Sequence, residues 1–268
     1  MTGCGKKAPR RGAFFASQAS IALVLLFVGV AAPASDCRPR RIDEQAIATW
    51  VFDGDTIEID HSAHVRFIGI NAPEIGKDGK ADEPYAQAAR KRLQQLLHEH
   101  GNRVALRLGR EKHDRYQRLL AHLYFDDGTS IQEQLLREGL ATTLEIPPNV
   151  SDADCYVAAE REARNAGRGV WSLPAYQPQN TTDLKPSAGG YHIVRGIVVR
   201  IGHSRKSIWL NLTGNVALRI ARSDLRYFPG YDWDNLGGKT VIVRGWIRSQ
   251  RGDLQMRVRH PAALEILE

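Results

Sequence analysis

The sequence predicts a mainly β protein with added helices, of the α+β class, and three observations support this. Apolar and polar residues alternate from Ala46 to Ile70, which indicates strands with one buried face. Apolar residues recur with helical spacing in several stretches between 82 and 167. After a segment rich in Pro, Gly, Asn and Thr, alternation returns in five short runs over 191–259, which suits a closed five-stranded barrel of the OB type.

The first half of the chain is predicted to combine strands and helices. Two strands, ATWVFDGDTIEID and HVRFIGI, should be joined by a polar turn at 61–63. Asp82 is the expected N-cap of the first helix, and Gly101 should end it. Two further strands and then two further helices follow. Their expected ranges are 103–109, 118–125, 130–139 and 151–167.

The last third of the chain is predicted to form the OB-like barrel. Its strands should span 191–201, 207–212, 215–221, 240–248 and 253–259. The two hairpin tips, 203–206 and 249–252, are basic and correspond to loops that flank the ligand groove of OB barrels. The residues expected to bind nucleic acid there are Arg205, Lys206, Arg248 and Arg251. The aromatic residues that offer either stacking faces or core packing are Trp209, Trp246 and Tyr227.

The net charge of +7 is unevenly distributed along the chain. Residues 1–34 carry four basic and no acidic side chains, residues 35–187 are mildly acidic, and residues 188–268 hold 13 basic and six acidic side chains. A basic body of this kind is typical of a segment that meets a polyanion, and a charge kept for solubility is the alternative. The nine histidines show no metal-site spacing, and no phosphate-binding glycine loop occurs.

An export signal is predicted at the N-terminus. The basic stretch KKAPRR precedes the apolar run IALVLLFVGVAAP, and APA at Ala32–Ala34 offers a small-residue cleavage site. The run is short for a spanning helix, so an uncleaved membrane anchor is the weaker alternative. The chain would then be periplasmic or secreted. It would keep Cys37 and Cys155, which either bridge in an oxidising compartment or remain two thiols.

These features divide the chain into four parts. They are the signal peptide at 1–34, a first domain at 42–173, a linker at 174–190 and a basic OB-like domain at 191–268. No internal repeat is evident in the sequence.

Acidic and basic residues are expected to meet at one end of the first hairpin. Folding the two strands about their turn places Asp55 opposite Gly69 and Asp53 opposite Asn71. By the period of two, Asp55 shares a face with apolar residues of its strand, and Arg66 does so on the next strand. Charges on apolar faces need partners. These two residues therefore either pair with each other as a structural ion pair or belong to a functional site.

Two further residues favour a functional site. Glu74 follows Pro73 at the strand exit, and Arg118 begins the strand after the HDRYQ loop. Two arginines, carboxylates for a cation and one free carboxylate are the groups that phosphodiester hydrolysis needs. A hard divalent cation held by oxygens screens the phosphate. Arginines bind the developing charge in a fork geometry, and the free carboxylate activates the attacking water.

Several motifs together resemble the staphylococcal nuclease (thermonuclease) family. DGDT, VRFIGINAPE, EPYAQAARKRL, DRYQRLLAHLYF, LLREGLAT and GRGVWS follow that family's order between Ile47 and Trp171. The resemblance implies an OB-type five-stranded barrel with added helices, and a nuclease that uses calcium (Ca²⁺) to cleave DNA and RNA. It also implies a role for each matching residue. Glu74 would activate water, Arg66 and Arg118 would bind phosphate, Asp55, Asn71 and the Ala72 carbonyl would ligate calcium, and Tyr116 and Arg115 would contact nucleic acid.

Two positions depart from the family pattern. Asn71 stands where the family usually has a second metal-binding aspartate. An amide oxygen can still ligate calcium, but the site loses one negative charge, so calcium affinity should fall. Glu145 and Pro147 occupy the region where the family has tyrosines that stack on the nucleotide. Base contacts should therefore be weaker or come from elsewhere, and the basic C-terminal barrel is expected to hold the polyanion while the first domain cuts.

Three functions are compatible with these residues. The favoured one is an exported, calcium-dependent endonuclease that acts on DNA or RNA as a monomer, with no obligate protein partner. The second is a nucleic-acid-binding protein of the cell envelope with weak or lost turnover, of which Asn71 would be the mark. The third is an envelope module whose basic barrel meets anionic polymer or protein. The joint presence of Asp55, Arg66, Glu74 and Arg118 favours the first.

Overall fold

The computed structural model describes residues 1–5, 37–250 and 253–267. Most of the expected signal peptide at 1–34, and the expected nucleic-acid contact Arg251, lie outside these ranges. In the part of the chain that is described, no helix combines the length and the hydropathy that crossing a membrane requires. The described residues from 37 onward belong to one compact unit, which contains two β-barrels.

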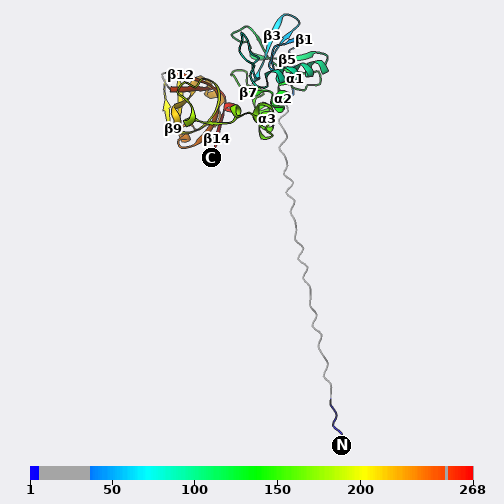
Figure 1. The fold of residues 1–268 in the computed structure, drawn as a ribbon, viewed down its shortest axis with the longest axis vertical. Helices are drawn as coiled ribbons and strands as arrows, with labels where there is room; N and C mark the ends of the chain where they lie inside the picture. The colour runs from blue at the N-terminus through cyan, green and yellow to red at the C-terminus, as the bar shows by residue number, and fades with distance from the viewer. Residues whose placement is uncertain (6–36, 251–252, 268) are drawn as a thin grey trace. The chain divides into compact units, whose positions relative to one another are not determined.

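Five strands close the first barrel (Figure 1). In their order around the ring they are β1 (Glu44–Val51), β2 (Thr56–Ile59), β3 (Ala63–Phe67), β6 (Leu119–Tyr124) and β5 (Arg103–His113). Neighbouring strands are antiparallel except for the parallel pair β3 and β6. Alternation along each strand turns one face into the barrel, where Ile57, Val65, Leu106 and Leu123 are completely buried.

The second barrel repeats this strand order. Its ring consists of β9 (Gly190–His203), β10 (Ser207–Leu212), β11 (Val216–Ala221), β13 (Asp253–Val258) and β12 (Thr240–Gln250). Again only one pair of neighbours, β11 and β13, is parallel. Two short strands, β8 (Gln179–Asn180) and β14 (Leu264–Leu267), extend the sheet beside β9 and β12. The expected five-stranded barrel is therefore confirmed, and each of its strands overlaps the range that alternation predicts.

Three helices accompany the first barrel. They are α1 (Ala86–Glu99), α2 (Ile131–Arg137) and α3 (Ala153–Asn165). The expected N-cap of α1 is wrong, because the helix is preceded by Tyr85 and not by Asp82. The Asp82 carboxylate instead accepts hydrogen bonds from the Gly76 backbone at 2.9 Å and the Gln87 side chain at 2.8 Å. Asp82 therefore stabilises the loop before the helix.

Each of the two strands expected in the first hairpin is divided. The first becomes β1 and β2, which are separated by the Asp53–Asp55 bend. The second becomes β3 and β4 (Gly69–Asn71), because Gly69 has a φ of +83°. A Cβ atom there would lie 2.5 Å from the Tyr156 ring, so only glycine fits. As a result, β4 leaves the barrel and pairs with β7 (Thr142–Leu144).

The expected register of the first hairpin is also corrected. Thr56 lies opposite Arg66, and the Phe67 N–H donates to the Asp55 carbonyl at 2.9 Å, so Asp55 faces Phe67 and not Gly69. The turn begins earlier than expected, at Asp60, which has a positive φ of 49°. Because the register differs by two residues, the parity is unchanged and Asp55 keeps the face that alternation predicts.

Cys37 and Cys155 form a disulfide, which decides between the bridge and the two free thiols. Their Cα atoms lie 5.5 Å apart across a sequence separation of 118 residues. Both residues are buried. The bridge therefore ties the chain segment before β1 to helix α3.

Loss of this bridge should destabilise the protein. Reduction, or the variant Cys155→Ser, is expected to lower the free energy of unfolding by about 2–5 kcal/mol, because the closed loop restricts the unfolded chain. Urea denaturation with and without reductant measures the difference. Cys155→Ser is also the matched control for reductant, since reductant should not shift the midpoint of a variant that has no bridge. A wild-type midpoint that does not respond to reductant would contradict the expectation.

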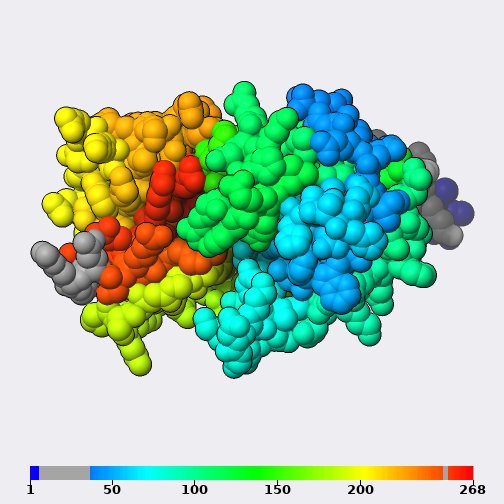
Figure 2. Space-filling model, turned by 90° about the horizontal axis from the view of Figure 1, so that it is seen from above, coloured from blue at the N-terminus to red at the C-terminus, as the bar shows by residue number. Residues whose placement is uncertain are grey.

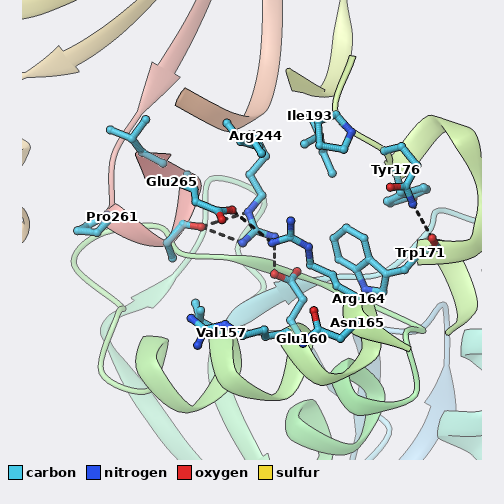
Figure 3. Close-up of a pocket in the computed structure, with 17 residues that line it drawn as sticks. Val157, Glu160, Arg164, Asn165, Trp171, Tyr176, Ile193, Arg244, Pro261 and Glu265 are labelled. Carbon is cyan, nitrogen blue, oxygen red and sulfur yellow. Dashed lines mark hydrogen bonds and ion pairs between the residues drawn. The ribbon is translucent and has the colours of Figure 1, made fainter. Parts of the chain in front are cut away.

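The second barrel contacts α3 through a buried ion pair. Arg244 of β12 donates to the Glu160 carboxylate of α3 at 2.5 Å, and Glu160 is 1% exposed. Glu160 also accepts the Thr143 N–H at 2.7 Å, so it links α3, β7 and β12. Figure 3 shows this pair at one side of a cavity of about 510 Å³, with Arg164 and Trp171 close by.

The segment expected to be a linker, 174–190, contains short regular elements. They are η2 (Pro174–Tyr176), β8 and η3 (Thr181–Asp183). β8 pairs in parallel with β9, and Thr181 is 1% exposed. The segment therefore packs against the second barrel.

Candidate catalytic site

Asp55 and Arg66 form an ion pair at the end of the β2–β3 hairpin that lies away from its turn. Arg66 Nη2 lies 3.0 Å from Asp55 Oδ2, and the two side chains are 12% and 2% exposed. The structural ion pair that the sequence left open is therefore present. Its surroundings decide whether it is also part of a site.

The Arg66 guanidinium is held by acceptors on several sides. Nη1 donates to the carbonyls of Phe67 at 2.6 Å and Ile70 at 2.9 Å. Nη2 donates to Asn71 Oδ1 at 3.2 Å as well as contacting Asp55. The left-handed backbone at Gly69 reverses the chain and brings these acceptors around one side chain. The guanidinium therefore has a fixed orientation and lies across the Asp55 and Asn71 oxygens.

Asp55 is a carboxylate that the fold surrounds almost completely. Its Oδ2 accepts the Ala72 N–H at 2.7 Å, and its Oδ1 accepts the Thr56 hydroxyl at 3.0 Å. Burial raises the pKa of Asp55 to about 7, against the lowering effect of Arg66, and the nearby charge of Asp53 raises it further. A second positive charge beside Asp55 would lower this pKa and favour the ionised form.

Glu74 lies beyond β4 and is exposed to solvent. Its backbone N–H donates to Glu83 Oε2 at 3.0 Å, which fixes the chain at this point. Partial desolvation raises the pKa of Glu74, Asp53 adds to the rise, and Arg66 opposes it. The charges of Asp53 and Arg66 thus both act on Glu74, and a raised pKa makes its carboxylate a stronger base.

The oxygens expected to ligate a cation belong to Asp55, Asn71 and the Ala72 carbonyl. The first two contact the same Arg66 nitrogen, and the Asn71 amide nitrogen lies 3.4 Å from the Ala72 oxygen. An all-oxygen donor set fits a hard divalent cation. It holds one carboxylate, and the described residues include no group of three or more His, Cys, Asp or Glu side chains placed for a metal. The donor types therefore fit calcium, but the set carries only the single negative charge of Asp55.

Among the described residues, no hydrogen bond or ion pair joins Arg118 to Asp55, Arg66 or Asn71, which form the first-barrel cluster. Its guanidinium instead pairs with Asp114, with Nε and Nη2 each 2.8 Å from Oδ2. Arg66 lies opposite Leu120 in the β3–β6 register. Alternation places Arg118, two residues earlier and about 7 Å along the strand, on the same face as Leu120. Arg118 therefore starts on the correct face but is held by Asp114, a partner that the sequence analysis missed and that the spacing of four residues could have indicated.

Tyr116 and Arg115 lie in the exposed turn between β5 and β6. Tyr116 is 64% exposed, and the Arg115 guanidinium lies 4.6 Å from its ring centroid. The Arg118 guanidinium lies 5.5 Å from the centroid of the same ring. The expected nucleotide contacts are thus brought together with Arg118, in a cluster of two guanidiniums around one aromatic ring.

Glu145 and Pro147 take different roles from the tyrosines that the family has there. Glu145 is buried, and neither of its carboxylate oxygens has a hydrogen-bond partner among the described residues. The Pro147 carbonyl accepts a hydrogen bond from Arg259 of the second barrel at 3.1 Å. Figure 2 shows the end of the chain, coloured red, against the green segment that contains these residues. This region is therefore covered by the second barrel.

The expected contacts of the second barrel that the structure describes lie on the surface of that barrel. Arg205 and Lys206 are exposed at the β9–β10 tip, and Arg248 is exposed on the outer side of β12. The tryptophans do not fill the barrel, because Trp246 is 44% exposed and Trp209 is half-buried. Core packing is therefore the wrong alternative for Trp246.

Comparison with known proteins connects the first barrel to nucleases. The model of the family described as "Staphylococcal nuclease homologue" matches residues 64–173. This range contains Arg66, Asn71, Glu74 and Arg118 but begins after Asp55. The assignment of Asp55 to the first-barrel cluster therefore rests on its contacts with Arg66 and Ala72.

Individual relatives give the same result. The chain is 34% identical over 131 residues to a thermonuclease of Staphylococcus intermedius, covering 48% of this chain and 76% of that protein. It is 35% identical over 128 residues to the SPbeta prophage-derived endonuclease YokF of Bacillus subtilis, covering 46% of this chain and 43% of that protein. For the Bacillus subtilis endonuclease YncB the identity is 34% over 128 residues, covering 46% and 60%. The chain thus spans about half the length of these two Bacillus relatives.

Proposed function

Because the chain belongs to the staphylococcal nuclease family, we propose that it is an exported, calcium-dependent nuclease that hydrolyses phosphodiester bonds of DNA or RNA. One observation carries the proposal: Arg66 contacts both Asp55 and Asn71, and its charge also acts on Glu74. The Cys37–Cys155 disulfide supports export, since such bridges persist in oxidising compartments.

Asp55, Asn71 and the Ala72 carbonyl would hold the calcium ion. When bound, the ion supplies positive charge that screens the phosphate and stabilises the charge that develops on it. The Asp55 and Asn71 oxygens that would hold the ion also contact Arg66. Arg66 keeps its two backbone acceptors, Phe67 and Ile70, even if its contact with those oxygens loosens.

The two arginines would bind the phosphate. Arg66 is already oriented by its carbonyl partners, so little side-chain freedom is lost when a phosphate oxygen arrives. Arg118 would exchange the Asp114 carboxylate for a phosphate oxygen of similar charge and geometry. Glu74 would accept the proton of the attacking water, which its raised pKa favours.

Cleavage assays test the proposal directly. Plasmid and single-stranded DNA are incubated with the full protein in calcium, and then in chelator. Chelator-sensitive cleavage is the expected result. Binding without cleavage would instead favour a nucleic-acid-binding protein with lost turnover, for which the presence of an amide at Asn71 is the specific observation.

Restoring the second carboxylate should strengthen calcium binding. We expect Asn71→Asp to lower the calcium concentration for half-maximal cleavage by about one order of magnitude, because ligand charge count tunes calcium affinity. A calcium titration of activity measures this. Asn211→Asp is the control, since it adds the same charge on β10 of the second barrel. Indistinguishable midpoints in wild type and Asn71→Asp would refute the assigned ligand role.

A further inference from the structure

A groove of about 440 Å³ lies between the outer face of the second barrel and the segment 143–146. β11, β13 and β12 form its floor on the barrel side. Residues 143–146 form its opposite wall, which begins within β7 and extends beyond the end of that strand. The charged and aromatic side chains that line it and matter here are Arg219, Arg248, Arg257, Arg259, Trp246 and Glu145.

The strand register places the arginines in rows across the barrel surface. Arg219 of β11 lies opposite Arg257 of β13, and Arg248 of β12 lies opposite Gln255 of β13. Neighbouring strands are about 5 Å apart, so side chains on adjacent strands stand within reach of one ligand. The alternating residues of the same strands, among them Leu218 and Met256, fill the barrel interior. Because these alternating residues point inward, the arginines between them point outward.

The guanidiniums outnumber the carboxylates that neutralise them. Arg257 and Arg259 share the single Asp224 carboxylate, at 2.8 Å and 3.5 Å. Arg219 donates to the neutral Ser207 hydroxyl at 2.9 Å. The Arg248 guanidinium has no ion pair or hydrogen bond with any described residue. The groove thus has an excess of positive charge, which a polyanion would complement.

One feature of the groove suits a nucleobase. Trp246 is 44% exposed and meets the Tyr191 ring edge-on with centroids 5.2 Å apart, which leaves an indole surface free for stacking. Glu145 also lines the groove, but both of its carboxylate oxygens are buried, so they do not face a ligand there. Burial raises the pKa of Glu145 well above its ordinary value.

The groove adjoins the first-barrel cluster through a two-stranded ribbon. Thr143, which lines the groove, lies opposite Ile70, and Thr142 lies opposite Asn71. The Thr142 hydroxyl also donates to the Asn71 carbonyl at 3.3 Å. The groove and the strand that carries Asn71 are therefore separated by about one strand spacing. A nucleic-acid strand that is bound at the first-barrel cluster can reach the groove within a few nucleotides.

We propose that this groove binds nucleotides of a single-stranded nucleic acid beyond the bond that is cut, with phosphates on Arg219 and Arg248 and a base on Trp246. The inference deepens the proposed nuclease function and rests on it. A single strand is the occupant because the free indole face requires an unpaired base. The groove takes the place of the tyrosines that are absent from the Glu145–Pro147 region.

Point variants in the full chain test the groove better than deletion of the second barrel. Deletion would remove Arg244 and leave the buried Glu160 carboxylate without its charged partner. The test variant is Arg219→Ala with Arg248→Ala. The matched control, Arg195→Ala with Arg200→Ala, removes the same charge from exposed positions of β9 outside the groove.

The first measurement is the affinity for a labelled 20-nucleotide single strand in chelator, where nothing is cut, at several salt concentrations. We expect the groove variant to bind about tenfold more weakly at low salt than the control, and its salt slope to fall by about 1.4, or about 0.7 for each lost phosphate contact. A Kd and a slope that match those of the control variant would overturn the proposal.

A second variant separates nucleic acid from other polyanions. Trp246→Ala should weaken single-strand binding by about tenfold through loss of stacking, with Trp246→Phe retaining most of it. Binding of heparin, which has no bases, should not change. If Trp246→Ala weakened heparin and DNA binding equally, or neither of them, the assignment of a nucleotide to the groove would be wrong.

Cleavage kinetics keep this proposal distinct from the proposed function. With calcium, the groove variant should cut a 20-nucleotide strand with a raised KM and an unchanged kcat, while kcat/KM for a dinucleotide stays at the wild-type value. Equal kcat/KM values of the variant and wild type on the long strand would contradict the groove. Failure of the wild type itself to cut either substrate would contradict the nuclease proposal instead.

Discussion

Replacing Glu74 with glutamine should lower kcat by about 10²- to 10⁴-fold, the range that general acid–base catalysis contributes. Glutamine keeps the shape of the side chain but cannot accept the proton of the attacking water. Binding of single-stranded DNA in chelator should stay within about twofold of the wild type, because the arginines and not Glu74 hold the phosphate. Steady-state cleavage at saturating calcium measures the loss.

Glu83→Gln is the matched control for this variant. Glu83 is a neighbouring carboxylate that contributes to the raised pKa of Glu74 and accepts its backbone N–H. Its glutamine variant can still accept that hydrogen bond, so only a small change in kcat is expected. The wild type should also lose kcat/KM towards acid as Glu74 is protonated, and Glu74→Gln should lack this dependence. A Glu74→Gln variant that kept a tenth or more of wild-type kcat would remove Glu74 from the chemistry.

Without calcium, the protein should lose stability as pH rises from about 4 to about 7. The folded pKa of Asp55, about 7, lies above its ordinary value of 3.8, so the folded state holds this proton over that range while the unfolded state releases it. The unfolded state therefore binds fewer protons, and the free energy of unfolding falls with rising pH. The contribution of this one group is at most on the order of 4 kcal/mol. Calcium should reverse the loss, because a cation favours the ionised carboxylate.

Urea unfolding at pH 5 and pH 8 measures this effect. The wild type in chelator should lose more stability between these two pH values than Asp55→Asn, which cannot titrate. The comparison removes the contributions of all other groups, which the two proteins share. Addition of calcium at pH 8 should stabilise the wild type and leave Asp55→Asn nearly unchanged. Parallel pH dependences in the two proteins would show that Asp55 titrates normally in the folded state.

The second barrel could be predicted from the sequence because its strands carry a strict local pattern. Inward residues such as Leu210 and Leu218 alternate with polar ones, and turns separate the strands. The division at Gly69 could not be predicted in the same way. It depends on the Tyr156 ring, which lies far along the chain and leaves no space for a side chain. Contacts between distant segments therefore set the details that alternation leaves open.

The same distinction between local patterns and distant contacts holds for the candidate site. The meeting of Asp55 with Arg66 and Asn71 follows from strand pairing and from motif order, and the contacts agree with it. The pairing of Arg118 with Asp114 depends on the side-chain conformation in a turn, which alternation does not specify. Burial of Glu145 depends on the second barrel, which covers the Pro147 segment. No pattern within residues 141–149 could have indicated that cover.

The Cys37–Cys155 bridge also changes what a proteolytic nick would do. A single cut between these two cysteines leaves two fragments that stay covalently joined through sulfur. Such a nicked chain keeps its mass in non-reducing electrophoresis and separates into two bands only after a thiol is added. A protein working among extracellular proteases would thereby remain one molecule after a cut in any of the loops that the bridge encloses.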